Sequence, residues 1–207
     1  MTILITAANA RTHVELLRAM HRDRKRVFVD WLGWDVPHDG GEERDAYDDD
    51  AAEYVVAAER ESGRHLGSVR LLRTDGPHIL GDIFPHLCDG PVPRSPLIRE
   101  ATRLCVSPDC PKEDRAEIRR RLVCALVEYG LMTGLEGFTM LTEISFLSRV
   151  AAAGWRCEML GLPTAHAGQT LGALQVHLDA GTIPAMRRAG VYVQPALHVG
   201  AADRLAA

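Results

Sequence analysis

Hydrophobic residues recur along the chain at two spacings, one typical of helices and one typical of strands. Over residues 11–28 apolar side chains return about every 3.6 residues, which predicts an amphipathic helix whose apolar face also carries Arg24. The same spacing predicts helices over 116–132 and 145–153. Short apolar runs predict strands at 54–58, 65–72, 97–106, 138–143 and 171–178.

A long polar segment separates the first predicted helix from the first predicted strand. Residues 33–52 are rich in Gly, Asp and Glu and show little periodicity, which favours a surface loop. Loops of that length are usually functional or disordered. Strands interleaved with helices indicate the α/β class. A chain of 207 residues fits one domain, which we expect over 1–195, with a tail at 196–207.

Composition narrows the range of partners. A net charge of −4 gives no reason to expect nucleic acid, and no apolar run reaches the roughly 18 residues that a membrane helix needs. Five cysteines form an odd set without a CxxC pair, and no secretory leader precedes them, which favours a reduced, cytoplasmic protein. The nine histidines include no HExxH motif and no Cys/His group of zinc spacing, so we expect no metal site.

Charged and aromatic residues follow a fixed order in the first half of the chain. They lie in four phrases, RVFVDWLGW at 26–34, GGEERDAYDDDAAEY at 40–54, GSVRLL at 67–72 and EATR at 100–103. In order and spacing these phrases resemble the signature of the acyl-homoserine-lactone synthases, the LuxI-type autoinducer synthases of bacterial quorum sensing. The resemblance implies the α/β/α sandwich that these enzymes share with the GNAT acyltransferases, with a bulged central strand.

The implied activity is that of an acyltransferase with two stages. The α-amine of S-adenosylmethionine attacks an acyl thioester, carried by acyl carrier protein or by CoA, and an amide results. The methionine carboxylate then attacks its own γ-carbon, which closes the lactone and expels methylthioadenosine. S-adenosylmethionine is a substrate in this scheme, and no metal or redox cofactor is needed.

Two other functions fit an acyltransferase-like sequence. A general GNAT N-acyltransferase acting on another amine would carry an Arg/Gln-x-x-Gly-x-Gly/Ala turn after the bulged strand to hold pyrophosphate, and residues 107–120 have no such glycine pair. A binding module without catalysis would have no need of both Glu100 and Arg103. We therefore expect a synthase.

An arginine on an apolar helix face needs a carboxylate beside it, because its charge cannot be removed by deprotonation. Asp45 and Asp48, three apart in the loop, could flank Arg24, and Arg70 could bridge to them from its strand. Such a four-residue ion network could simply pin the loop to the sheet. The resemblance implies that these positions shape the S-adenosylmethionine pocket, where an anionic wall would suit an ammonium and a sulfonium.

Two aromatic residues border the same polar loop. Phe28 and Trp34 would by default be core residues. The resemblance places both in the S-adenosylmethionine pocket, where a ring face can attract the sulfonium or stack on the adenine.

Glu100 and Arg103 are the predicted catalytic pair. Three positions apart in a strand, their side chains would point to opposite faces unless a bulge intervenes. The resemblance implies such a bulge, whose freed amides could bind a thioester carbonyl. Glu100 would be the general base, directly or through a water, and Arg103 would orient it or hold the ligand carboxylate. A plain surface ion pair is the alternative.

The acyl chain needs an apolar tunnel. The expected wall residues would serve equally well in ordinary core packing, and they are Phe84, Met140, Leu141, Thr142 and Phe146. In some members of the family a Thr or Ser in this strand is associated with acceptance of 3-oxo-acyl groups, and Thr142 lies near that position. The arginines at 115 and 119–121 could attract an acidic carrier protein or could form a solvated helix face, which the interspersed acids favour.

Overall fold

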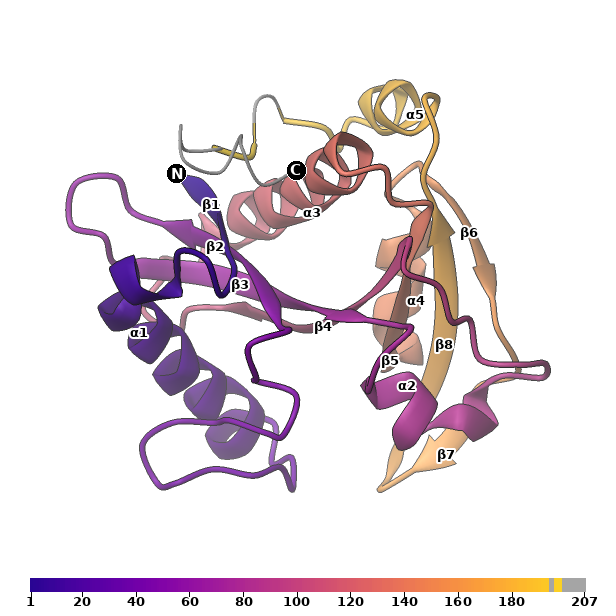
Figure 1. Ribbon diagram of the computed structural model, residues 1–207, viewed down its shortest axis with the longest axis horizontal. Helices are drawn as coiled ribbons and strands as arrows, with labels where there is room; N and C mark the ends of the chain where they lie inside the picture. The colour runs from indigo at the N-terminus through magenta and orange to yellow at the C-terminus, as the bar shows by residue number, and fades with distance from the viewer. Residues whose placement is uncertain (194–195, 199–207) are drawn as a thin grey trace. The chain divides into compact units, whose positions relative to one another are not determined.

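The computed structural model describes residues 1–193 and 196–198, and these fold into two compact units (Figure 1). The first unit contains residues 1–71, 103–126 and 196–198, and the second contains residues 72–102 and 127–193. The single domain expected over 1–195 stays a prediction. Most of the predicted tail at 196–207 lies outside the described residues.

The first unit is built on antiparallel strands in the order β1-β2-β3. Their bounds are Thr2–Ile5, Glu53–Ala58 and His65–Arg73, of which the last two were predicted and β1 was not. The helix α3 (Arg115–Met132) packs over Gly67, where a Cβ atom would lie only 2.9 Å from Ile118. A side chain at that position would push the helix off the strand.

The predicted helix over 11–28 forms in two parts. A short 3-10 turn, η1 (Ala10–Thr12), precedes the α-helix α1 (Val14–Arg24), and a π-helical segment, η2 (Lys25–Trp31), continues it. In η2 the backbone N–H of Leu32 donates to the carbonyl of Val27, five residues earlier. Widened turns of this kind occur often at functional sites.

The second unit holds a mixed sheet in the order β4-β5-β8-β6, with β7 paired to the far end of β8. Their bounds are Ile98–Val106 for β4, Gly137–Glu143 for β5, Gln169–His177 for β8, Arg156–Met159 for β6 and Thr164–His166 for β7. The pair β4–β5 is parallel and the other pairs are antiparallel. The predicted strands at 97–106, 138–143 and 171–178 are confirmed.

Helices cover both faces of this sheet (Figure 1). On one face α4 (Ile144–Ala151) packs Leu147 against Gly172 of β8. On the other face lie two short helices, α2 (Ile79–Asp82) and η3 (Pro85–Leu87), whose Leu80 and Leu87 pack on Ala173. The helix α5 (Thr182–Arg188) follows β8. Strands interleaved with covering helices confirm the predicted α/β class.

The strand β4 is irregular where the sequence predicts a bulge. Arg103 has φ of +54°, a left-handed conformation that is rare outside glycine and typical of bulged residues. Pairing of β4 with β5 runs from Ile98–Gly137 to Ala101–Met140 and ends there, although both strands continue. No helix among the described residues has the length and hydropathy of a membrane span.

Candidate active site

Three arginines and three carboxylates form a buried ion cluster in the first unit. All six side chains are at most 9% exposed. The ion cluster consists of Arg24 from α1, Glu43, Asp45 and Asp48 from the loop before β2, Arg70 from β3 and Arg103 from β4.

Two of the contacts in the ion cluster are two-pronged. Arg24 donates from both terminal nitrogens to Asp48, at 2.7 and 2.9 Å, and from Nε to Glu43 at 2.5 Å. Arg70 donates in the same way to Asp45, at 2.6 and 3.0 Å, and its first terminal nitrogen also lies 2.9 Å from Asp48. Paired N–H groups meeting paired oxygens fix the orientation of both partners.

Arg103 completes the ion cluster from the irregular point of β4. Its Nε donates to Glu43 at 3.1 Å and a terminal nitrogen donates to Asp45 at 2.8 Å. Glu43 therefore joins Arg24 to Arg103, and Asp45 joins Arg70 to Arg103. The left-handed backbone at Arg103 is thus held where its side chain has two buried partners.

The loop residues fold back on themselves at the same point. The backbone N–H of Asp45 donates to Asp48 at 3.0 Å, and that of Tyr47 donates to Asp45 at 2.9 Å. The hydroxyl of Tyr54 donates to Asp48 at 2.9 Å. The spacing of three between the two aspartates therefore makes a turn whose carboxylates face the arginines.

The charges of Asp48 and Arg24 stabilise each other. Burial alone would raise the pKa of Asp48, but the hydrogen bonds and charge of Arg24 outweigh it and hold that pKa well below its usual range. Burial opposes the charge of Arg24, yet its hydrogen bonds with Asp48 and Glu43 raise its pKa. Burial and then the charge of Arg24 lower the pKa of nearby His21 to about 4, so that imidazole is neutral at pH 7.

An aromatic pair lies against the ion cluster. The rings of Phe28 and Trp34 are stacked, with centroids 4.8 Å apart and planes 20° apart. The guanidinium carbon of Arg103 lies 5.7 Å from the first ring centroid and 5.9 Å from the second, within cation–π range. The backbone N–H of Trp34 donates to the carbonyl of Phe28 at 2.8 Å, so the end of η2 brings the rings together.

The structure brings together Arg24, Asp45, Asp48 and Arg70, as the sequence predicts, but pairs them differently. Asp45 serves Arg70 and Arg103 instead of flanking Arg24. The sequence reasoning also missed two members. Glu43 was not singled out, and Arg103 was assigned to Glu100. Three partly buried arginines would need three carboxylates, and that count would have indicated that a third acid was missing.

Carboxylate oxygens of Glu43, Asp45 and Asp48 lie within 4.8 Å of one another, a spacing that would suit a cation. Each carboxylate already forms ion pairs with two arginines of the cluster. A metal ion there would meet the charge of those guanidinium groups at close range. The donor set therefore fits arginine and does not fit a metal ion.

Glu100 lies in the second unit and is fully buried. Its two oxygens accept hydrogen bonds from the backbone N–H groups of Ile79 and Leu80, at 2.7 and 2.8 Å. These are the first residues of α2, whose unpaired N–H groups a carboxylate can satisfy. Glu100 therefore anchors α2 to β4, a role that the sequence did not suggest, and its part in catalysis stays a prediction.

The predicted acyl-pocket residues fall on two faces of the sheet. Phe84 and Leu141 pack in the apolar cluster around Leu80, Leu87 and Ala173. Met140 and Thr142 alternate with Leu141 along β5 and so point to the opposite face, which α4, the helix that carries Phe146, covers. A single tunnel wall cannot contain all five, and the two sets stay separate predictions.

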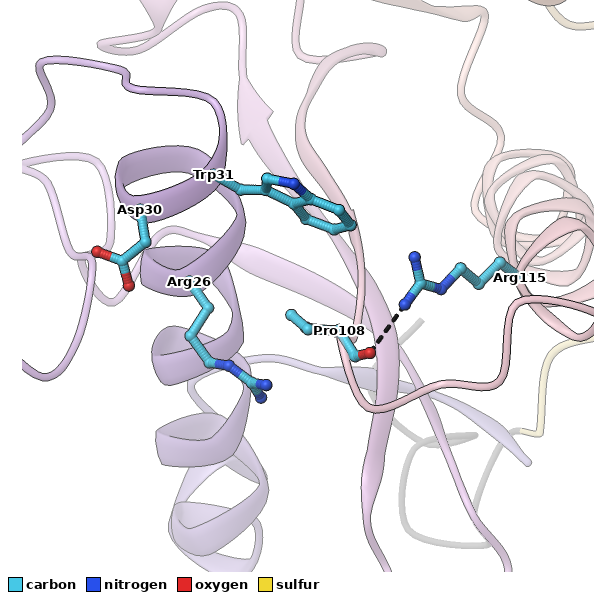
Figure 2. A pocket seen from close by; sticks show the side chains of 5 residues that line it. All are labelled: Arg26, Asp30, Trp31, Pro108 and Arg115. Atoms are coloured by element: carbon cyan, nitrogen blue, oxygen red, sulfur yellow. Dashed lines mark hydrogen bonds between the residues drawn. The ribbon is translucent and has the colours of Figure 1, made fainter.

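A surface hollow of about 360 Å³ lies in the first unit and contains none of the predicted site residues. Figure 2 shows its lining, which is Arg26, Asp30, Trp31, Pro108 and Arg115. Arg115 donates to the carbonyl of Pro108 at 2.8 Å, and its guanidinium carbon lies 5.7 Å from the ring centroid of Trp31 (Figure 2). These contacts hold the chain that leads into α3.

The arginines further along α3 show the features of a solvated helix face. Arg120 and Arg121 both pair with Glu117, one turn earlier, and all three side chains are at least 32% exposed. Intrahelical pairs of this kind stabilise a helix slightly. The interpretation as a solvated face is therefore favoured over a carrier-protein surface.

Comparison with known proteins gives a consistent result. Residues 7–185 match the family model described as autoinducer synthase. An acyl-homoserine-lactone synthase of Agrobacterium fabrum is 32% identical over 190 residues, which cover 89% of this chain and 90% of the relative. An isovaleryl-homoserine lactone synthase of Bradyrhizobium diazoefficiens is 32% identical over 161 residues, 77% of this chain and 71% of the relative.

Similar solved structures agree with the family match. The CoA-dependent acyl-homoserine lactone synthase BjaI, solved with S-adenosylmethionine and isopentyl-CoA, has a TM-score of 0.87 and 28% identity, covering 100% of this chain and 97% of its own. The CoA-dependent synthase MesI has a TM-score of 0.85 and 27% identity, covering 97% and 100%. An acyl-CoA N-acyltransferase of Pseudomonas aeruginosa, at 12% identity and a TM-score of 0.56, shows the fold alone.

The fold and the site thus define an acyltransferase with a GNAT-like architecture. Within that class the chain belongs to the autoinducer synthase family, whose members are acyl-homoserine-lactone synthases.

Proposed function

We propose that this protein makes an acyl-homoserine lactone from S-adenosylmethionine and an acyl-CoA. The observation that carries the proposal is the ion cluster with its stacked Phe28–Trp34 pair, because the residues of the family's charged and aromatic series converge there. The family match over residues 7–185 supports the same activity.

The aromatic pair is the proposed contact for the adenosyl group. Trp34 is partly exposed while Phe28 is 4% exposed, so the indole is the ring that a ligand can reach. Base stacking on an aromatic face contributes about 1–3 kcal/mol. Arg103 is held beside both rings by Glu43 and Asp45, and it is the proposed partner for the methionine carboxylate.

CoA is the proposed acyl donor. Two synthases whose names state CoA dependence match this chain with TM-scores of 0.85 and 0.87 over at least 97% of its length. The synthase LasI matches with a TM-score of 0.75 over 84% of this chain. The isovaleryl relative makes short branched acyl-CoA thioesters the first donors to test.

The proposed chemistry places the proton transfer at the amine. The α-ammonium must lose a proton before its nitrogen can attack the thioester carbon, and Glu100 is the proposed acceptor, directly or through a water. The thiol of CoA leaves as the amide forms. Ring closure then needs orientation above all, since a sulfonium is already a cationic leaving group. The reaction is expected in the cytoplasm, because no disulfide joins the five cysteines, all of which lie among the described residues.

The test is a direct assay of purified protein. Protein, S-adenosylmethionine and a panel of acyl-CoAs and acyl carrier proteins are combined, and lactone and methylthioadenosine are measured by mass spectrometry. We expect equal amounts of both products with at least one acyl-CoA. Acylation of a different amine without methylthioadenosine would refute the proposal, and product only from carrier-bound acyl groups would refute the choice of donor.

Two tryptophans offer a matched pair of variants for this assay. Trp34→Ala removes the accessible ring of the aromatic pair and should raise the KM for S-adenosylmethionine about 10-fold or more. Trp31→Ala removes a ring of equal size that is 63% exposed and lies in the surface hollow, and should change that KM less than about twofold. Equal effects of the two changes would remove the aromatic pair from the binding site.

A further inference from the structure

A row of polar side chains crosses the sheet of the second unit. The strand register aligns Glu100 of β4 with Thr139 of β5, Thr139 with Gln175 of β8, and Gln175 with Glu158 of β6. Side chains of residues paired in register project from the same face of a sheet, and in antiparallel pairs their Cβ atoms lie about 4.5–5.5 Å apart. The four side chains therefore form one line on one face, which we call the polar row.

The polar row runs from the interior to the surface. Glu100 and Thr139 are 0% exposed, Gln175 is half-buried, and the side chain of Glu158 is 65% exposed. At the outer end Glu158 pairs with His177 at 2.8 Å. Groups able to exchange protons with solvent thus stand at one end and a buried carboxylate at the other.

Thr139 has no hydrogen-bond partner for its buried hydroxyl among the described residues. Burial of an unpaired hydroxyl is unfavourable, and Val would fill the same volume without that penalty. Each oxygen of Glu100 accepts a backbone N–H group, and a carboxylate oxygen can accept more than one hydrogen bond. The register sets the buried Thr139 hydroxyl beside this carboxylate.

The neighbouring positions on this face are apolar. Two residues further along their strands, Leu141 and Ala173 lie side by side in the register, and Leu160 donates its backbone N–H to Ala173. Leu80 and Leu87 pack over them. The polar row thus borders an apolar cluster, which is the arrangement that a thioester with an acyl tail would need.

We propose that Thr139 is a positioning residue for removal of the amine proton. Its hydroxyl and the Glu100 carboxylate hold one water between them, since a buried water needs two or more polar partners. The N–H bond of the ammonium breaks, its electron pair stays on nitrogen, and its proton passes to that water while the water gives a proton to Glu100. This inference rests on the proposed function.

The closing experiment compares Thr139→Val with Thr139→Ser in the lactone assay. Thr139→Val should lower kcat about 10-fold or more and leave both KM values within about twofold, because proton transfer slows while binding does not. Added imidazole or higher pH should restore part of the lost rate. Thr139→Ser, which keeps the hydroxyl, should stay within about threefold of the parent. Thr170→Val, on the exposed part of β8, is the matched control.

Thermal unfolding of Thr139→Val shows whether misfolding could cause a loss of kcat in this variant. Because Val keeps the shape of Thr, Thr139→Val should unfold in one cooperative transition with a midpoint close to that of the parent. An unaltered kcat in this variant, while the parent makes lactone, would overturn the inference and leave the proposed function standing. Absence of lactone from the parent would overturn both. A crystal structure of the parent should also show a water within hydrogen-bond distance of both Thr139 Oγ1 and Glu100, and a water-free contact there would count against the proposal.

Discussion

Replacing Asp48 with Asn tests the physical basis of the ion cluster most directly. The change keeps the shape of the side chain and removes one negative charge from three. Asp48 meets both terminal nitrogens of Arg24, one nitrogen of Arg70 and the hydroxyl of Tyr54. The amide nitrogen of Asn would face one of these donors instead of accepting from it, and the buried cluster would carry a net charge of +1.

The expected cost follows from burial. The side chains of Asp48 and Arg24 are 2% and 1% exposed, so solvent cannot screen the uncompensated guanidinium. Removal of one partner from a buried ion pair typically costs about 3–5 kcal/mol. Because small domains are stable by only about 5–15 kcal/mol, Asp48→Asn should lose a large fraction of its free energy of unfolding.

The effect of pH has a definite sign. The pKa of Asp48 in the folded protein lies far below the unfolded value of about 3.9, so the unfolded chain binds the proton first as pH falls. The stability that the Asp48 charge contributes is complete above that unfolded value and declines below it. Asp48→Asn lacks this contribution at every pH, so below about pH 4 its stability should fall less steeply than that of the parent.

Urea unfolding followed by circular dichroism, at pH 7 and at several values between 5 and 3, measures both effects. Asp50→Asn is the matched control, because Asp50 is exposed in the same loop, and it should change the free energy of unfolding by less than about 0.5 kcal/mol. A loss below about 1 kcal/mol for Asp48→Asn would refute the reasoning that the cluster is a desolvated, mutually dependent set.

Two further changes separate other parts of the argument. His21→Gln should flatten the pH dependence of the free energy of unfolding between about pH 6.5 and 4. Over that range the unfolded histidine takes up a proton, while the folded one, with a pKa of about 4, does not. The parent should therefore lose up to about 3 kcal/mol of its free energy of unfolding as pH falls through this range. Urea unfolding at pH 7 and 4.5 measures the difference, and parallel curves would contradict it. Glu100→Gln should lower kcat on the order of 10²-fold and remove the acidic limb of its pH profile if Glu100 is the base. An unchanged kcat in Glu100→Gln would refute that role. A lower melting midpoint with an unchanged acidic limb of the kcat profile would mean that Glu100 only anchors α2.

Hydrophobic periodicity predicted the main elements because these have long buried faces. The strands β2, β3, β4, β5 and β8 and the helix α3 all form close to their expected bounds. The strands β1, β6 and β7 were missed, and each has only three or four residues, too few for a period of two to be visible. Sequence patterns therefore give long elements and overlook short edge strands.

The widened turn at Lys25–Trp31 was beyond the same reasoning. A continuous 3.6-residue pattern fits residues 11–28 well, yet the last part forms i→i+5 hydrogen bonds. That geometry accompanies tertiary contacts of Phe28 with Trp34 and Arg103, which join residues from the helix end, the loop and β4. Local propensity contains no information about such contacts.

The role of Glu100 at α2 was hidden for a similar reason. The hydrogen bonds to Ile79 and Leu80 join residues about 20 apart, and α2 has only four residues, so no capping pattern marks its start. The split of the acyl-pocket residues, in contrast, could have been foreseen. Met140 and Leu141 are adjacent in a predicted strand and must face opposite sides of the sheet.

The charge count changes how the site can recognise a cation. An excess of acid beside the aromatic pair was expected to attract the sulfonium, but three carboxylates meet three guanidinium groups and the ion cluster is neutral. Net charge therefore cannot select the ligand. The cluster instead supplies orientation. The two-pronged pairs fix the side chains of Arg24 and Arg70, and the shared acids fix that of Arg103. Arg103 in turn lies against the rings of Phe28 and Trp34. A ligand that carries a carboxylate, a cation and an adenine together would gain binding energy from such fixed partners. A simple cation would not, because the guanidinium of Arg103 already occupies the position beside the acids and the rings.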